Sequence, residues 1–466
     1  MALRYWLPCN GNITNLGMAD AVGIDEIPVY AEGLSGKALT TEVYIPADRV
    51  NDVMLGKEFS VAMWIYVDAA AGTTPSSTIF FGYDHKRIHC LYTYPTVNDL
   101  HWSYHNDDLS RFPCAGVITG ALPSYTWTHV VLTYDGHNVR IYVNGEQKGS
   151  GIYDIPWTDY SIITPLTYTR TDFRYNDIRI YDHCLSAKEI DIISRPLIFR
   201  QKLSRGADPL IYNDPEYSSF GLSDLSGFGY DITPVGNVVW QTNSPLSYGS
   251  VAFDGRGYFK TSNLGLKTPS CTYTFWAKIS DWSAMVQDQI YPVLSFADEL
   301  TEIKFLNGHL HATIETEDSY CDHSYDVSTL SSGWHFFSVA YRLGCMEIRA
   351  DNNNAFGVCY NESSNLETGT GEMRIGMDLN GNIANGLSIY DLRVYASMLS
   401  EDDLNDLYAA KIGVDNKGNL YAHDIEPNTD MIAFGANGVV KADVTESENG
   451  FRAYKDHIEC TNYQEI

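Results

Sequence analysis

Short runs of β-branched and aromatic residues, alternating with polar positions, dominate the chain. Residues 130–134 and 139–143 are two such runs, joined by Asp135-Gly136 and closed by Asn144-Gly145. Because Asn, Asp and Gly tolerate positive φ, this pattern predicts a β-hairpin. Apolar and polar positions alternate in the second run, which predicts a strand with one buried face.

The pattern occurs twice along the chain. The sequence at 177–186 (DIRIYDHCLS) is similar to the sequence at 391–400 (DLRVYASMLS), and the two are offset by 391 − 177 = 214 residues. Two pairs of tryptophans repeat at similar offsets, 276 − 64 = 212 and 334 − 127 = 207. Markers in one order with loop-sized differences indicate a tandem duplication.

Helices are predicted only after the last strand of each unit. Ser186 with Glu189, and Ser400 with Asp403, have the spacing of a capping box. We expect each helix to seal one end of its unit.

These signals predict three segments. The first unit spans residues 1–198 and the second spans 206–410, with a basic, irregular stretch between them. Residues 411–466 form a small β-rich element that is too short for a generous core. We expect it to act in assembly.

Charge and composition narrow the class of partner. The 466 residues carry 31 Lys and Arg against 59 Asp and Glu, a net charge of −28, which disfavours nucleic acid and anionic membranes. The chain begins without an apolar run of signal-peptide length and has no apolar stretch long enough to span a membrane. The nine cysteines, without a C-x-x-C motif, are predicted to be free thiols of a protein made in a reducing cytosol.

The motifs resemble the laminin-G-like, concanavalin-A-like lectin/glucanase superfamily. They include FSVAMW at 59–64, WTHVVLTYDG at 127–136, DIRIY at 177–181 and, in the second unit, VAFDG at 251–255. The first unit has LTTEVY at 39–44 in place of that last motif, so its match is partial. The resemblance implies an all-β fold of two tandem antiparallel jelly-roll β-sandwiches. It does not fix a function, because this fold hosts sugar binding, hydrolysis and scaffolding.

Four tryptophans are the predicted structural core. A large indole can fill the space between two sheets about 10 Å apart. We expect Trp127 and Trp334 to do so, and we expect Trp64 and Trp276 to belong to the structural core as well.

Sugar binding requires exposed aromatic rings beside polar groups. The candidates in the first unit are Tyr92, Tyr94, Trp102, Tyr104, His105 and Asp107. Those in the second are Tyr320, Asp322, His323 and Tyr325. Tyrosines that simply cover a sheet are the alternative interpretation.

Catalytic and metal sites are weakly supported. Glu189 and Asp191 imitate the carboxylate pair of retaining glucanases, but Ile193 stands where the last Glu belongs and the segment follows a helix cap. No catalytic residue and no cofactor is predicted, and the chain is not expected to be an enzyme. Asp378, Asn380 and Asn382 are calcium candidates, with a simple Asx turn as the alternative.

The whole chain is similar to virion proteins of tailed bacteriophages, in its opening sequence, its tandem units and its small β-rich tail. This resemblance implies a non-enzymatic structural protein on the virion surface, made in the host cytoplasm. Its partners would be other virion proteins, further copies of itself and host or mucosal glycans. A carbohydrate-binding receptor module or bacterial adhesin is the alternative, and a glycan hydrolase is a weaker one.

Overall fold

The computed structural model describes residues 3–409 and four short segments, 413–414, 420–421, 451–453 and 458–460. Within 3–409 it leaves out 12, 14, 16–26, 42–57, 74–77, 85–86, 94–95, 106–113, 153–161, 166–172, 202, 204–221, 223, 225, 227, 242, 244, 246–249, 267, 354–355, 360–364, 367–368 and 370. The chain divides into two compact units near Arg195 and Pro196.

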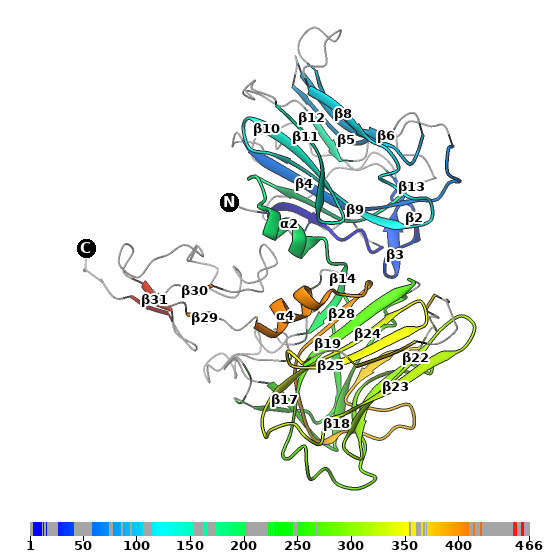
Figure 1. The fold of residues 1–466 in the computed structure, drawn as a ribbon, viewed down its shortest axis with the longest axis vertical. Helices are drawn as coiled ribbons and strands as arrows, with labels where there is room; N and C mark the ends of the chain where they lie inside the picture. The colour runs from blue at the N-terminus through cyan, green and yellow to red at the C-terminus, as the bar shows by residue number, and fades with distance from the viewer. Residues whose placement is uncertain are drawn as a thin grey trace. The chain divides into compact units, whose positions relative to one another are not determined.

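Unit one is a sandwich of two antiparallel sheets (Figure 1). Its eight-stranded sheet has the order β11 (Glu146–Ile152), β10 (Asn138–Val143), β9 (Trp127–Tyr134), β4 (Phe59–Val67), β13 (Phe173–Tyr181), β3 (Lys37–Leu39) and β2 (Tyr30–Glu32), with β1 (Leu3–Leu7) also paired to β13. The five-stranded sheet has the order β12 (Ile162–Pro165), β5 (Thr78–Asp84), β6 (Arg87–Thr93), β7 (Leu100–His105) and β8 (Cys114–Ile118).

Unit two repeats this architecture. Its eight-stranded sheet has the order β16 (Val239–Gln241), β17 (Ser250–Asp254), β28 (Asn385–Tyr395), β19 (Ser270–Ile279), β24 (His335–Arg342), β25 (Cys345–Ala350) and β26 (Phe356–Cys359), with β14 (Leu197–Gln201) paired to β28. The seven-stranded sheet has the order β15 (Thr233–Gly236), β18 (Gly257–Thr261), β27 (Met373–Ile375), β20 (Tyr291–Phe296), β21 (Glu302–Leu306), β22 (His309–Glu315) and β23 (Tyr320–Asp326).

The predicted all-β fold of antiparallel β-sandwiches is confirmed. The eight-stranded sheets of the two units share one strand order, since β11, β10, β9, β4, β13, β3 and β2 correspond in turn to β26, β25, β24, β19, β28, β17 and β16. The repeat also includes β1 and β14, whose first residues, Leu3 and Leu197, face Tyr181 and Tyr395. Residues 197–201 are therefore the first strand of unit two, although the sequence suggested the end of unit one and a connecting stretch.

The predicted hairpins form. Asn144 and Gly145, between β10 and β11, have φ of 50° and 81°, and Leu343 and Gly344, between β24 and β25, have 43° and 82°. Positive φ at both central residues matches the twist of the flanking strands. In the 411–466 segment the structure describes two short ladders, β29 (Gly413–Val414) with β30 (Leu420–Tyr421) and β31 (Phe451–Ala453) with β32 (Ile458–Cys460).

Each predicted helix begins at its capping box. In α2 (Ala187–Ile193) the amide of Ser186 donates to Glu189 at 2.7 Å, and in α4 (Glu401–Ala409) the amide of Ser400 donates to Asp403 at 2.9 Å. The helices do not seal an end of the sandwich. Each lies against the outer side of the eight-stranded sheet of its unit, where it covers apolar side chains (Figure 1). Among the described residues no helix is long and apolar enough to cross a bilayer.

The four marker tryptophans do not fill the space between the sheets. Trp276 is buried under α4, with its ring centroid 5.8 Å from that of Tyr408, and Trp64 lies against His129 at 5.0 Å. Trp127 and Trp334 are only half-buried. The prediction that these two indoles bridge the sheets is therefore wrong, because their strands present the neighbouring positions to the core.

Other indoles bridge the sheets. In unit two Trp282 is fully buried and contacts Phe305 of the seven-stranded sheet at 5.1 Å and Phe337 of the eight-stranded sheet at 5.5 Å. In unit one Trp102 of β7 reaches Gly149 of β11. A large ring between two sheets is worth several kcal/mol, of order 3–5 on truncation to alanine.

The structure also corrects the thiol prediction. Cys345 and Cys359 face each other across β25 and β26 and form a disulfide. Cys9, Cys184, Cys271 and Cys321 are free.

Candidate functional site

The side of the seven-stranded sheet that faces away from the core carries a row of polar side chains, here called the central row. Its two middle members, Ser295 and Glu302, are buried, and the other members are at least partly exposed. Strand register places these residues opposite one another: Lys260, Arg374, Ser295, Glu302, Thr313 and Asp322. They come from six neighbouring strands, so successive members are separated by the inter-strand distance of about 4.8 Å. Most of the alternate residues of the same strands, such as Phe259, Leu294, Ile303 and Ala312, are buried in the core.

A second polar row lies beside the first, two residues along the strands. Lys304 faces His311, which faces Ser324, and the next position pairs His309 with Asp326. Because residues i and i+2 of a strand share a face, both rows lie on one surface. We call the two rows together the polar face.

Ion pairs hold the cations of the polar face. Glu372 accepts from Arg374 at 3.0 Å and from Lys260 at 3.2 Å. Desolvation opposes ionisation of Glu372, but these two partners lower its pKa overall. Lys304 pairs in the same way with Glu302. The side chains are therefore fixed in direction while their charges largely cancel.

One of the two histidines of the polar face, His311, lies in surroundings that favour its neutral form. The rings of His309 and His311 lie 5.9 Å apart. Partial burial of His311, followed by the charge of His309, lowers the pKa of His311 below its usual value. A neutral imidazole has one donor and one acceptor nitrogen, which suits hydroxyl groups.

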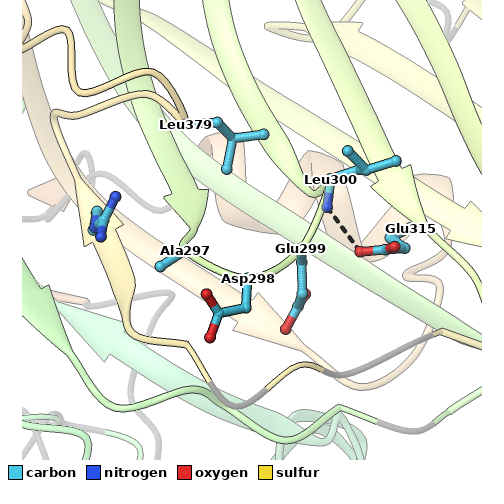
Figure 2. A pocket seen from close by; sticks show the side chains of 7 residues that line it. Ala297, Asp298, Glu299, Leu300, Glu315 and Leu379 are labelled. Atoms are coloured by element: carbon cyan, nitrogen blue, oxygen red, sulfur yellow. Dashed lines mark hydrogen bonds between the residues drawn. The ribbon is translucent and has the colours of Figure 1, made fainter.

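A pocket adjoins the central row (Figure 2). Its cavity volume is about 500 Å³, and its lining is Ala297, Asp298, Glu299, Leu300, Glu315, Arg374 and Leu379. Glu315 accepts a hydrogen bond of 2.7 Å from the amide of Leu300, as Figure 2 shows. Glu299 is held by the side chain of Asn263 at 2.6 Å and by the amide of Gly369 at 2.7 Å.

The sugar-binding candidates of unit two do not form one site. They lie on β23, where Tyr320 and Asp322 are exposed on the side of the polar face. His323 and Tyr325 take the alternate positions, opposite the buried Ala312 and Leu310. The ring of His323 stacks at 5.0 Å on Phe356 of the other sheet. Strand alternation thus divides a set that is contiguous in sequence.

The candidates of unit one are also redistributed. Trp102 is 5% exposed and belongs to the hydrophobic core, so its predicted role as a sugar platform is wrong. Its strand neighbours point alternately in and out, and Trp102 occupies an inward position. Tyr92, Tyr104 and His105 lie in β6 and β7 but their side chains are not described, and Tyr94 and Asp107 are outside the described residues.

The calcium candidates form a loop closed by its own hydrogen bonds. Asp378 is fully buried and accepts from the amides of Asn380 at 2.9 Å and Asn382 at 2.7 Å. The side-chain amide of Asn382 donates to the second carboxylate oxygen of Asp378 at 2.7 Å. This is the geometry of the Asx turn that was the alternative prediction. Across the part of the chain that the structure describes, no group of three His, Cys, Asp or Glu residues is arranged for a metal ion.

Two arrangements resemble catalytic sites without their geometry. Glu189 caps α2, and Asp191 pairs with Arg195 at 2.8 Å, so both belong to a helix. Ser331, His335 and Asp351 form a series, but Nε2 of His335 lies 2.8 Å from the carbonyl of Ser331 and 3.5 Å from its hydroxyl.

The surroundings of His335 favour its cationic form. Burial lowers its pKa, but the hydrogen bonds to Asp351 and to the Ser331 backbone raise it above the usual value. Nδ1 lies 2.6 Å from Asp351, so both ring nitrogens donate. A general base needs a neutral nitrogen facing the hydroxyl. The contacts among Ser331, His335 and Asp351 therefore stabilise the loop that contains Ser331.

Sequence reasoning missed the polar face. Its members are single residues spread between positions 260 and 374, and only the strand register brings them together. The alternation in the segment HLHATIE at 309–315 was the available signal.

Residues 39–191 match the family model described as the concanavalin A-like lectin/glucanases superfamily. This match, within unit one, agrees with the resemblance stated from the sequence. Comparison with curated proteins gives no match.

Solved structures similar to the chain include receptor-binding domains of botulinum neurotoxins. One is the domain of mosaic serotype C/D, with 17% identity and a TM-score of 0.37, covering 47% of this chain and 51% of that chain. The binding domain of serotype D has 16% identity and a TM-score of 0.35, covering 47% and 52%. The chain thus spans about half the length of these structures. They are toxin domains and not phage proteins.

Proposed function

We propose that the chain is a glycan-binding protein without hydrolytic activity, and that the polar face of unit two is its binding surface. The observation that carries this proposal is the central row, in which six strands contribute one polar side chain each in register. A sugar chain lying across the strands, which are about 4.8 Å apart, meets Lys260 and Arg374 on one side of the buried middle pair and Thr313 and Asp322 on the other.

The chemistry of the face suits hydroxyl groups. A hydroxyl both donates and accepts, and the exposed part of the central row offers cationic donors, the carboxylate of Asp322 and the hydroxyl of Thr313. Ion pairs hold the long side chains of Lys304 and Arg374 in place. Less side-chain entropy is then lost on binding, which favours affinity.

Charge favours a neutral glycan. The cations of the face are already paired with Glu302 and Glu372. A chain with a net charge of −28 also repels polyanions at long range. The expected ligand is therefore a neutral polysaccharide or the neutral part of a surface glycan.

The carboxylates of the face are bound in ways that argue against hydrolysis. Retaining and inverting hydrolysis both use one carboxylic acid with a raised pKa and one carboxylate. Glu302 accepts from the amide of Leu379 at 3.0 Å and pairs with Lys304, and the pKa of Glu372 is lowered. Glu372 therefore lacks the raised pKa that a catalytic acid needs, and Glu302 lacks the free position, because it is occupied by its two partners.

A glycan array tests the proposal directly. The wild-type chain is expected to bind at least one neutral glycan, and the double variant Lys304→Ala/Asp322→Ala should bind it at least about tenfold more weakly. Asp402→Ala is the control, because Asp402 is exposed in α4, away from the face. Equal binding by all three proteins would refute the assignment to this face.

We also propose, from the sequence resemblance, that the chain is a virion component of a bacteriophage and forms homo-oligomers through residues 411–466. Deleting these residues should change the mass measured by light scattering while both units stay folded. A monomeric full-length chain would contradict this second proposal, and glycan binding would remain to be judged separately.

A further inference from the structure

An aromatic cluster lies on the outer face of the eight-stranded sheet of unit one. Tyr66 of β4 faces Trp127 of β9, and their ring centroids lie 5.4 Å apart at an angle of 48°. Tyr125 is 59% exposed, and its amide donates to the carbonyl of Val67 at 2.8 Å. We call Tyr66, Tyr125 and Trp127 the aromatic platform.

The backbone holds Tyr125 in an unfavourable conformation. Its φ is 59°, in the left-handed region that non-glycine residues rarely adopt. Such conformations cost free energy and persist where the surrounding structure enforces them, often at binding sites. Here the result is a large, exposed aromatic side chain two residues before the half-buried Trp127.

Polar groups border the platform. The guanidinium carbon of Arg174 lies 4.8 Å from the ring centroid of Tyr66. Arg174 also pairs with Asp68 and donates to the carbonyl of Glu32 at 3.0 Å. The side chain of Asp68 is 35% exposed, so an external hydroxyl can reach it. The charges of Arg174 and Asp68 offset each other.

The duplication shows that the fold does not require this cluster. The repeat offsets and strand register place Lys278, Ser388 and Trp334 at the positions of Tyr66, Arg174 and Trp127. In unit two the indole Nε1 donates to Asn243 at 2.6 Å, and Ser388 accepts from Gln241 at 2.8 Å. Only the indole is common to both units, so the remaining groups are specific to unit one.

We propose that the aromatic platform is a second sugar site, which binds a single pyranose ring of a neutral glycan. The C–H face of the sugar stacks on Trp127 and Tyr125, while its hydroxyls bond to Asp68 and Arg174. Aromatic faces supply apolar contact with little entropy loss, and the paired charges provide one acceptor and one donor without net charge. The site goes beyond the polar face, which lies in unit two.

Fluorine NMR of the chain labelled with 5-fluorotryptophan tests this site. Trp127→Phe identifies the Trp127 resonance, and methyl glycosides of glucose, galactose, mannose, N-acetylglucosamine and N-acetylgalactosamine are titrated singly. At least one glycoside should shift that resonance, and Tyr125→Ala should weaken the binding about tenfold or more. The matched control is the Trp334 resonance, identified by Trp334→Phe, which should not respond.

The outcomes separate the two proposals. If no glycoside moves the Trp127 resonance, or if a proline-rich peptide alone does so, the platform is not a sugar site. If array binding is lost in Lys304→Ala/Asp322→Ala at the same time, the polar face stands without the platform. A Trp127 shift that Tyr125→Ala leaves unchanged would also overturn the platform.

Discussion

The indole Nε1 of Trp6 donates a hydrogen bond of 2.7 Å to Oδ1 of Asp177, a buried residue inside β13. In unit two, Arg200 stands at the position of Trp6 and donates from Nε to Asp391 at 3.2 Å. Asp177 and Asp391 have φ of 51° and 49° and lie at matching irregularities of the central strand. Each of the duplicated units therefore uses a buried aspartate of its central strand to bind a side chain of its first strand.

We predict that Asp391→Asn destabilises unit two by about 3–5 kcal/mol, because Arg200 and Arg393 would remain buried without their shared carboxylate. Asn tolerates positive φ, so the backbone is not the cause. Urea titration measures the change.

Asp177→Asn is the matched comparison, since Asp177 binds one arginine, Arg179, and the neutral indole of Trp6. Its cost should be smaller. A larger cost for Asp177→Asn would contradict this account.

The packing of Trp102 predicts a coupled pair of variants. A Cβ on Gly149 would lie 2.6 Å from the Trp102 ring, so Gly149→Ala should cost about 1–3 kcal/mol. Trp102→Ala should cost about 3–5 kcal/mol, as for a core indole. In the double variant the alanine no longer clashes, so the costs should be less than additive. Strict additivity in denaturant titrations would mean that the two residues do not touch.

The two units should respond to pH in opposite directions. In unit one burial, and next the charge of Arg179, lower the pKa of His129 to about 3. The unfolded histidine titrates near 6.5, so stability is present above about pH 6.5 and is lost as the pH falls towards 3. In unit two the raised pKa of His335 gives stability that is present below about pH 6.5 and is lost as the pH rises through the folded-state pKa.

Calorimetry between pH 4 and pH 8 checks this, with His335→Gln as the control that should abolish the alkaline loss in unit two. Parallel pH profiles for both units would contradict the assignment.

The disulfide predicts a redox-dependent stability. Cys345 and Cys359 are separated by 14 positions, and closing a loop of roughly 15 residues is worth about 3 kcal/mol. A reductant should lower the free energy of unfolding of unit two by about this amount. The double variant Cys345→Ser/Cys359→Ser should be insensitive to reductant; if the wild type is equally insensitive, the bond does not form.

The sequence predicted the features that depend on local chemistry. The hairpin at Asn144-Gly145, both capping boxes and the antiparallel sandwich follow from turn residues, caps and alternation. It failed where an outcome depends on which face a residue occupies. Trp102 and Tyr320 are both aromatic strand residues, yet one is core and the other exposed, because strand parity relative to the core is set by tertiary packing.

Long-range register explains the remaining differences. The polar face joins Lys260, Glu302 and Asp322, which no local window contains. The shared role of Trp6 and Arg200 was also hidden, because an indole and a guanidinium can both donate an N–H to a buried carboxylate although the two residues have no sequence similarity.

Glycan-array binding of the full chain, wild type against Lys304→Ala/Asp322→Ala, tests the central claim most directly. We predict that the wild type binds neutral glycans and that the double variant, folded by circular dichroism, loses this binding about tenfold or more while Asp402→Ala keeps it. Undiminished binding by the double variant, or no binding by the wild type to any neutral glycan, would contradict the account.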